Sequence, residues 1–171
     1  MNTAFNRRTV LLAAAVGAGA TLLQACGGGD DEPQRNIVEV AQNNPDLSIL
    51  VEAVVAAGLA PTLSTGMLTV FAPTNAAFAA LLAELGVTKE ALLADTALLT
   101  TVLTYHVVPA RVLKAEVPIN TAIATVQGQT FTVNASLVIT DQNLRTSNIT
   151  MADVFTSNGV IHVVDKVILP K

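Results

Sequence analysis

The chain of 171 residues has no tryptophan, one tyrosine, one cysteine and two histidines. A single cysteine excludes an intrachain disulfide. With so few histidines and thiols, a metal site would need several carboxylates, and the sequence does not place them at ligand spacing, so we expect no metal and no cofactor. No Gly-rich phosphate loop and no Gly-x-Ser-x-Gly elbow is found. A Ser-His-Asp triad forms only in space and stays an alternative, but the sequence predicts that the protein is not an enzyme.

Charged residues are also scarce, at 13%, whereas 51% of the residues are hydrophobic. Much of this excess lies at the start, where Arg7 and Arg8 precede an uncharged apolar run, Val10 to Leu23. Fourteen helical residues span about 21 Å, which is less than the roughly 30 Å of a bilayer core. A buried helix would show one polar face, and this run has none. We therefore predict that residues 1–25 are an export signal.

The run ends in Leu23-Gln24-Ala25-Cys26, which resembles the bacterial lipobox. The small Ala25 suits the cleaving peptidase, and the sulfur of Cys26 is the nucleophile that takes a diacylglyceryl group. The alternative is an incidental thiol. Because two or three acyl chains give stable attachment, we expect lipid attachment at Cys26. The two arginines also resemble a twin-arginine signal, so the export route stays open.

Loss of residues 1–25 leaves seven basic and thirteen acidic residues, a net charge of −6. An acidic surface is poorly suited to phosphate backbones, so nucleic acid is not an expected partner. Residues 26–35 contain three glycines and three acids and read as a flexible lipidated linker. Gly27, directly after the cysteine, resembles an outer-membrane sorting signal. We expect an exported protein that is lipid-anchored to the cell envelope, at the outer membrane or facing the periplasm or the cell surface, and the membrane that carries the anchor stays open.

Residues 36–171 are numerous enough to bury a hydrophobic core without stabilising disulfides or metal ions. Their first half has the apolar spacing of helices, interrupted by a short apolar run that is typical of a strand, Leu68 to Phe71. The expected N-caps of the helices are Asp46, Thr74, Thr88 and Asp95, and the expected stops are Gly58 and Gly86.

The second half has the period and composition of strands. Phe131 to Val133 and Leu137 to Ile139 flank a three-residue turn, and the apolar stretch from Val160 to Ile168 follows the turn dipeptide Asn158-Gly159. Helices first and strands later favour an α+β fold, with helices packed on a mostly antiparallel sheet.

Three segments resemble the fasciclin (FAS1) domain family. They are Thr69 to Phe78, which matches the first signature block, the pair Tyr105-His106, and Asn158 to Pro170, which matches the second block. The resemblance covers nearly all of residues 36–170. It implies a wedge-shaped β-sandwich with helices on one side, and a role in adhesion.

Within these blocks, structural roles are the favoured interpretation. We expect the side chain of Thr74 to cap a helix, and that of Asn75 to do the same or to bridge to a nearby loop. Asn158 and Gly159 are expected to form a turn, and His162 to be a satisfied or partly exposed residue of its strand. At a helix-to-strand junction, Tyr105 and His106 can satisfy buried backbone groups, although contact with a partner is the alternative.

One pair of residues has a partner-binding interpretation that comes from the resemblance alone. In some animal members an Asp-Ile pair before the second block contributes, with the Tyr-His region, to integrin binding. Asp153-Val154 occupies the matching place here. The competing interpretation is an aspartate that closes a turn.

Two main hypotheses about function follow, and a purely structural envelope protein without a discrete partner is a third possibility. The leading one is a surface-anchored, non-catalytic module that mediates adhesion or binds a protein or glycan at the cell envelope. The second is a carrier of a small apolar ligand such as a pigment or a lipid, because some relatives of this fold bind pigments. The five phenylalanines and one tyrosine are few for such a pocket.

Overall fold

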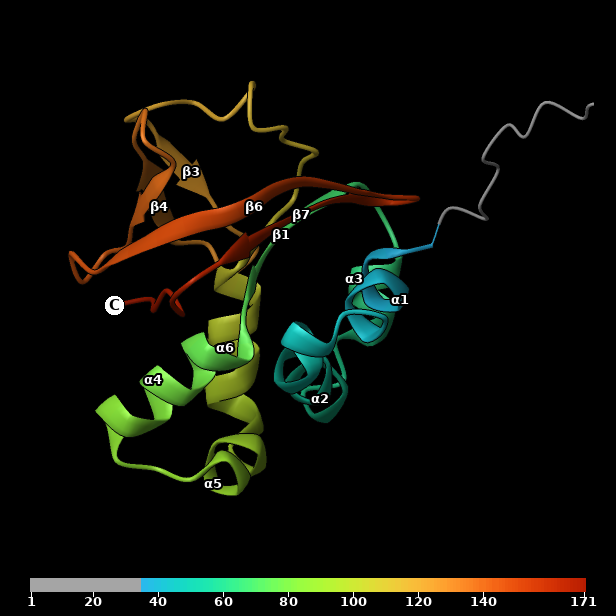
Figure 1. Ribbon diagram of the computed structural model, residues 1–171, viewed down its shortest axis with the longest axis vertical. Coiled ribbons are helices and arrows are strands. Elements are labelled where there is room, and N and C mark those ends of the chain that lie inside the picture. Colours follow the sequence, from blue (N-terminus) through green and yellow to red (C-terminus); the bar gives the residue numbers. More distant parts are fainter. Residues whose placement is uncertain (1–34) are drawn as a thin grey trace, which may run out of the picture. The chain divides into compact units, whose positions relative to one another are not determined.

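The computed structural model describes residues 35–171 (Figure 1). The predicted export signal, Cys26 and nearly all of the predicted linker therefore lie outside the described residues. Within the described part, no helix is long and apolar enough to cross a membrane.

Six α-helices and one 3-10 turn make up the helical part of residues 35–171. They are α1 (Ile37–Gln42), η1 (Pro45–Leu47), α2 (Ser48–Ala56), α3 (Ala60–Ser64), α4 (Asn75–Leu85), α5 (Lys89–Ala94) and α6 (Thr96–Tyr105). A capping box opens α1, in which the Asn36 side chain accepts from the Glu39 N–H and the Glu39 carboxylate accepts from the Asn36 N–H.

Most of the predicted caps are confirmed. Thr74, Thr88 and Asp95 each accept a backbone N–H with the side chain at the start of α4, α5 and α6. Gly86 ends α4 with φ 65°, a left-handed value that glycine adopts without a steric cost.

The prediction of Asp46 as a cap was wrong. Asn44 accepts the Asp46 N–H at 3.0 Å and opens η1, because Pro45 fits the first position of a tight turn and has no N–H to satisfy. The helix then begins two residues later, at Ser48. It ends at Ala56, and the expected stop at Gly58 is confirmed, because Gly58 follows the Ala57 cap with a left-handed φ of 67°.

Seven strands form one sheet in the order β2-β1-β7-β6-β5-β4-β3. Their bounds are β1 (Leu68–Pro73), β2 (Val107–Val108), β3 (Ala122–Ala124), β4 (Thr130–Val133), β5 (Val138–Thr140), β6 (Thr146–Thr156) and β7 (Gly159–Val164). Only β1 and β7 pair in parallel, so the sheet is mostly antiparallel as expected. The Val126 N–H donates to the Val107 carbonyl at 2.8 Å, which brings the two ends of the sheet together and nearly closes it.

The last strand is shorter than predicted. It ends at Val164 instead of continuing to Ile168, because Asp165 turns its carboxylate to the Asn148 N–H at 2.7 Å. The following backbone bonds to side chains: the Lys166 N–H donates to Ser147, and the Ile168 N–H donates to His106.

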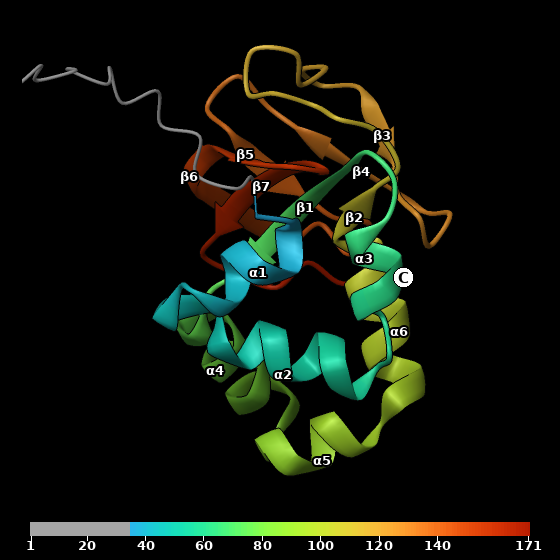
Figure 2. The ribbon, with the colours of Figure 1, turned by 90° about the vertical axis from the view of Figure 1, so that its right-hand side faces the viewer.

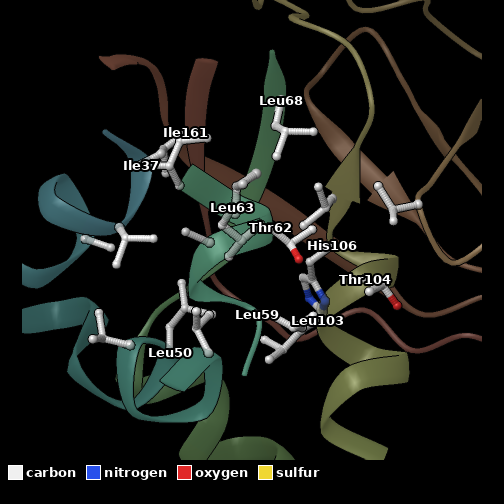
Figure 3. Close-up of a pocket in the computed structure, with 18 residues that line it drawn as sticks. Ile37, Leu50, Leu59, Thr62, Leu63, Leu68, Leu103, Thr104, His106 and Ile161 are labelled. Atoms are coloured by element: carbon white, nitrogen blue, oxygen red, sulfur yellow. The ribbon is translucent and has the colours of Figure 1, made fainter. Parts of the chain in front are cut away.

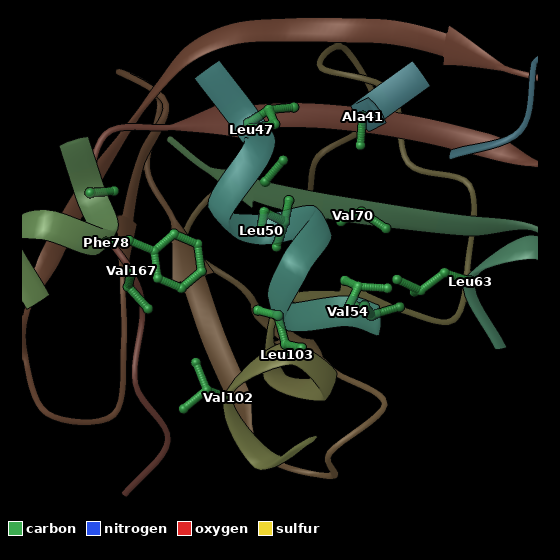
Figure 4. Close-up of a cluster of buried hydrophobic side chains, with 14 of the residues drawn as sticks. Ala41, Leu47, Leu50, Val54, Leu63, Val70, Phe78, Val102, Leu103 and Val167 are labelled. Atoms are coloured by element: carbon green, nitrogen blue, oxygen red, sulfur yellow. The ribbon is translucent and has the colours of Figure 1, made fainter. Parts of the chain in front are cut away.

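Two groups of buried side chains hold the domain together. The larger one lies between the helices and one face of the sheet (Figure 4), and the helices gather on that side (Figure 2). The smaller one fills the interior of the curled sheet, where Phe71 meets Phe131 edge-on at 5.0 Å and Tyr105 meets Phe131 at 6.1 Å. The predicted α+β class, with helices on one side of a sandwich, is confirmed.

Candidate functional site

Tyr105 ends α6 and lies inside the curled sheet, with 0% of its surface exposed. Its hydroxyl donates to the Thr130 carbonyl at 2.9 Å, which fastens the end of α6 to β4. Burial raises the pKa of Tyr105 to about 12, because the phenolate would lose its hydration. The hydroxyl is therefore a donor at every physiological pH.

His106 is the next residue and is also buried. Its Nε2 accepts the Ile168 N–H at 3.1 Å, so the proton of the neutral ring lies on Nδ1, which donates to the Val102 carbonyl at 2.7 Å. Burial lowers the pKa of His106 to about 4. Both side chains of the Tyr-His pair serve the architecture here, and direct contact with a partner would require the domain to open.

His162 plays a similar part in β7, where it is fully buried against Phe71. Its Nε2 lies 3.0 Å from the Val112 carbonyl and its Nδ1 accepts the Asp153 N–H at 3.3 Å. Thr69 on β1 adds two bonds to the same segment, donating to the Ala110 carbonyl and accepting the Val112 N–H. Together these side chains hold residues 110–117, which we call the strap, against the sheet.

Asp153 occupies a bulge in β6, where the register with β7 shifts between Met151 and Val154. Its φ of 58° is left-handed, which aspartate tolerates better than most residues. Its carboxylate accepts the Lys114 N–H of the strap at 2.7 Å. Val154 turns the other way and packs against the helix-side core. Asp153 thus serves the architecture through a segment 39 residues away in the chain rather than by closing a local turn, and its partner role stays a prediction.

Around Asp153 lies an open cleft of about 410 Å³, between the strap, the turn from β4 to β5, and the β6 bulge. We call it the Asp153 cleft. Its lining residues are Lys114, Ala115, Val117, Ile119, Asn134, Ala135, Ser136, Leu137 and Asp153. Leu137 and Asp153 both have positive φ values, as does Asn120 beside Ile119. Strained backbone of this kind clusters at functional sites.

The remaining motif residues fasten the elements to one another. Asn75 donates to the Pro45 carbonyl and accepts the Ile49 N–H, so it joins α4 to the start of α2. Asn158 accepts the Ile37 N–H at 3.0 Å and donates to the Leu63 carbonyl at 2.7 Å. It thereby holds α1 and α3 at the turn before β7.

Gly159 is needed for close approach of two backbones. A Cβ atom at this position would lie 1.8 Å from the Leu68 carbonyl oxygen of β1, and φ is 156°. Any side chain would therefore separate β1 from β7, the parallel pair of the sheet.

A second hollow lies among α1, α2, α3 and β1 (Figure 3). Nearly all its lining side chains are apolar, among them Leu50, Leu63 and Leu103, and the ring of His106 lies at its border. The cavity volume is about 50 Å³, well below the roughly 300–1,000 Å³ of ordinary ligand pockets. In the conformation described, it has no room for a pigment.

The geometry offers little to a catalytic reaction. The chain has two histidines, and both rings have both nitrogens engaged with backbone groups. Neither is free to activate a hydroxyl. Within residues 35–171, no three His, Cys, Asp or Glu side chains gather in a group that could hold a metal ion.

Sequence reasoning found Asp153 but missed the rest of the cleft. Lys114 and Ile119 belong to the connection between β2 and β3, and Leu137 belongs to the turn between β4 and β5. None of them carries a local pattern that marks it. Only the fold brings these loops together. The one local signal is the position of Asn134, which accepts the Ser136 and Val138 N–H groups and fixes the turn that presents Leu137.

Comparison with known proteins agrees with this architecture. The family model described as "Fasciclin domain" matches residues 45–170. In the search of solved structures, the FAS1 domain pair of the insect cell adhesion molecule Fasciclin I superimposes with a TM-score of 0.70 at 16% identity, over 79% of this chain and 51% of that chain. At that identity the likeness shows the fold alone.

Several bacterial proteins are similar in sequence. "Protein sll1483" of Synechocystis sp. is 46% identical over 138 residues, which is 78% of this chain and 73% of that protein. "Immunogenic protein MPB70" of Mycobacterium bovis is 36% identical, over 80% of this chain and 70% of its own length. "Cell surface glycolipoprotein MPB83" of the same species is 34% identical, over 80% and 61%. The chain belongs to the fasciclin domain family.

Proposed function

We propose that this chain is an exported, lipid-anchored, non-catalytic protein whose fasciclin domain binds a protein or glycan at the cell envelope. The observation that carries the proposal is the Asp153 cleft. It is open to solvent, mixed in polarity and about 410 Å³ in volume, and two of its lining residues, Leu137 and Asp153, have left-handed backbone. Binding sites of proteins commonly lie on loops.

The names of similar proteins support the proposed location of this chain at the cell envelope. MPB83 is called a cell surface glycolipoprotein, and the structural neighbour is a cell adhesion molecule. In this chain the apolar run after Arg8 and the lipobox-like Leu23 to Cys26 supply an export signal and an attachment residue.

The anchor has a direct test. Cells that produce the protein are labelled with a palmitate analogue, and the parent chain is compared with Cys26→Ala. We expect the label in the parent and none in the variant. Equal labelling of both would refute attachment at Cys26.

The binding role is tested by a substitution that separates charge from architecture. Asp153→Asn keeps a side-chain oxygen for the Lys114 N–H and tolerates a positive φ, but it removes the negative charge. The parent and the variant, immobilised on beads, are exposed to matrix, host and envelope components. The parent retains a component that Asp153→Asn retains less well, at an unchanged melting temperature. Glu116→Gln, an exposed acid of the strap that does not line the cleft, serves as the charge control.

Two results would count against this role. Equal retention by the parent and by Asp153→Asn would show that the Asp153 carboxylate is not part of the binding surface. A parent that retains nothing from such panels would contradict the binding function itself.

The carrier hypothesis has weaker support. The apolar hollow among α1, α2 and α3 is the place where a small apolar molecule would go, but at about 50 Å³ it would have to expand several-fold. Native mass spectrometry of purified protein decides between the two functions, because a carrier retains its ligand and an adhesion module does not.

A further inference from the structure

Phe155 is the one exposed phenylalanine among the described residues. It lies on β6 with 60% of its surface exposed, whereas Phe71, Phe78 and Phe131 are each 1% exposed. The guanidinium carbon of Arg111, which is also exposed, lies 5.7 Å from the centre of the Phe155 ring. The pair is amphipathic, because the ring is apolar and the guanidinium is a charged donor of several hydrogen bonds.

The fold holds this pair in place. Phe155 lies in the same row of the sheet as Thr69 of β1, with β7 between them. The Thr69 hydroxyl binds the residues on both sides of Arg111: it donates to the Ala110 carbonyl at 2.7 Å and accepts the Val112 N–H at 2.8 Å. The backbone of Arg111 is therefore fixed, and the guanidinium and the ring are preorganised for contact with a partner.

The described chain begins beside the same pair. The Ser157 N–H donates to the Arg35 carbonyl at 3.0 Å, and Ser157 follows Phe155 by two strand residues, about 7 Å. Met67 directly precedes β1 at this end of the sheet and is 51% exposed. Figure 1 shows the start of the described chain next to the end of the β6–β7 hairpin. We call this region the Phe155 end of the sheet.

The length of chain before Arg35 limits how far the Phe155 end can lie from an anchor. Cys26 precedes Arg35 by nine residues, and nine residues span at most about 32 Å. The opposite end of β6, at Thr146, is nine strand steps from Phe155, which is roughly 30 Å. A domain attached through Cys26 therefore keeps its Phe155 end close to the membrane, whereas the opposite end can lie about twice as far away.

We propose that the Phe155 end of the sheet contacts the phospholipid surface to which the chain is anchored. The ring of Phe155 lies at the boundary between headgroups and acyl chains, and the Arg111 guanidinium binds phosphate oxygens of the headgroups. This inference rests on the proposed lipid attachment at Cys26.

The contact does not depend on a net positive surface. The acids nearest in the sequence are Glu116, five residues after Arg111, and Asp153, two residues before Phe155. The apolar ring provides the attraction, and every phospholipid headgroup has a phosphate that a single guanidinium can bind. Neither Arg111 nor Phe155 lines the Asp153 cleft, so contact with the membrane and binding of a partner are separable.

A weak contact is sufficient because the chain is tethered. A free domain with one exposed phenylalanine would bind a membrane only marginally, since even a single myristoyl chain is a marginal anchor. Attachment through Cys26 makes the contact intramolecular, with an effective concentration in the millimolar range for a short linker. The contact then fixes the orientation of a domain that is already held at the membrane.

The test measures this orientation with the lipidated chain in vesicles of phosphatidylethanolamine and phosphatidylglycerol that contain a headgroup spin-labelled lipid. A fluorophore is attached to a new cysteine, either in Ala110→Cys, next to Arg111, or in Leu144→Cys, beyond the opposite end of β6 and 83% exposed. Cys26 is the only native cysteine, and lipidation blocks its sulfur. We expect the spin label to quench the fluorophore at residue 110 several-fold more than the fluorophore at residue 144. Equal quenching at both positions, or stronger quenching at residue 144, would overturn the proposal.

Three substitutions, each made in Ala110→Cys, identify the side chains responsible. Phe155→Ser removes the apolar contact, and Arg111→Glu places a negative charge against the phosphates. Each should lower the quenching at residue 110 toward the level at residue 144, with vesicle binding retained through the anchor. Val55→Ser, at a similarly exposed position (59%) on α2, is the control and should change nothing. Unchanged quenching in Phe155→Ser or in Arg111→Glu would contradict the proposal.

Flotation of the vesicles separates this inference from the proposed anchor. A parent chain that floats with the vesicles but shows equal quenching at the two positions refutes the membrane contact and leaves the attachment at Cys26 standing. A parent chain that does not float with the vesicles refutes the attachment itself, and the inference falls with it.

Discussion

Protonation of His106 should destabilise the domain as the pH falls below neutrality. The ring is fully buried, accepts the Ile168 N–H with Nε2 and donates to the Val102 carbonyl with Nδ1. A second proton would replace the acceptor with a donor that faces the Ile168 N–H. It would also place a charge in the core beside the apolar cavity.

The magnitude follows from the pKa values of the two states. Burial lowers the pKa of His106 from 6.5 to about 4 in the folded protein. Between these two pKa values the unfolded chain binds a proton at His106 and the folded domain does not, so the free energy of unfolding decreases as the pH falls. The contribution is complete above pH 6.5 and is lost on acidification to about pH 4. At 1.36 kcal/mol per pKa unit, the loss is roughly 3 kcal/mol.

The assay is urea unfolding at pH values from 7.5 to 4, for the parent and for His106→Gln. Glutamine is neutral throughout this range and can still accept and donate a hydrogen bond. The carboxylates titrate in both proteins, so the difference between the two unfolding free energies isolates His106. We expect the advantage of the parent over the variant to shrink by roughly 3 kcal/mol on acidification. A difference that does not vary with pH, or an NMR titration of the His106 ring near pH 6.5, would refute the reasoning.

Further predictions concern architecture and can be checked by thermal unfolding monitored by circular dichroism. Gly159→Ala should prevent folding or lower the melting temperature steeply, because the new Cβ would meet the Leu68 carbonyl at 1.8 Å; Gly128→Ala, whose Cβ meets nothing within 4 Å, should cost only about 1 kcal/mol. Tyr105→Phe should cost about 1 kcal/mol by removing the bond to the Thr130 carbonyl, and an unchanged stability would contradict the role given to that bond. Asn158→Ala should cost about 2 kcal/mol, since it leaves two backbone groups of α1 and α3 unpaired.

Local signals in the sequence predicted several helix boundaries, because caps and stops act over a few residues. Thr74, Thr88, Asp95 and Gly86 lie where their side chains or backbone preferences place helix ends. The prediction at Asp46 was wrong because Asn44, two residues earlier, could also serve as a cap, and the fixed φ of the intervening Pro45 decided in favour of Asn44.

Long-range features could not be predicted in the same way. The end of β7 depends on Asp165 meeting Asn148, seventeen residues away along the chain. The strap depends on His162, whose bonds join segments that are nine and fifty residues distant. A buried neutral histidine needs two hydrogen-bond partners, because its ring has one donor and one acceptor nitrogen, but only the fold decides which backbone groups those are.

The candidate site also combines residues that local sequence signals predict with residues that only the fold brings together. Asp153 could be named from the sequence, since the resemblance to the fasciclin family pointed to it. Its surroundings could not be named, because Leu137 and Lys114 reach the cleft through separate loops. The positive φ values of Leu137 and Leu144 also carry no sequence signal, because leucine is an unfavourable choice for such backbone.

The polar residues of the fasciclin motifs stabilise the fold, whereas the exposed loops offer the surface on which a partner can bind. This difference decides which substitutions can locate the binding site. Four polar side chains of the motifs each form a hydrogen bond with a backbone group of a distant segment: His106, His162, Asn75 and Asn158. Substituting any of them removes contacts that hold helices or the strap to the sheet, so loss of binding after such a change says nothing about the binding surface. A residue is assigned to the binding surface only when its substitution changes binding and leaves stability unchanged. For Asp153 the suitable substitution is Asp153→Asn, because asparagine keeps the bond to the strap. Isosteric substitutions in the loops, rather than alanine substitutions in the motifs, will therefore locate the partner of this domain.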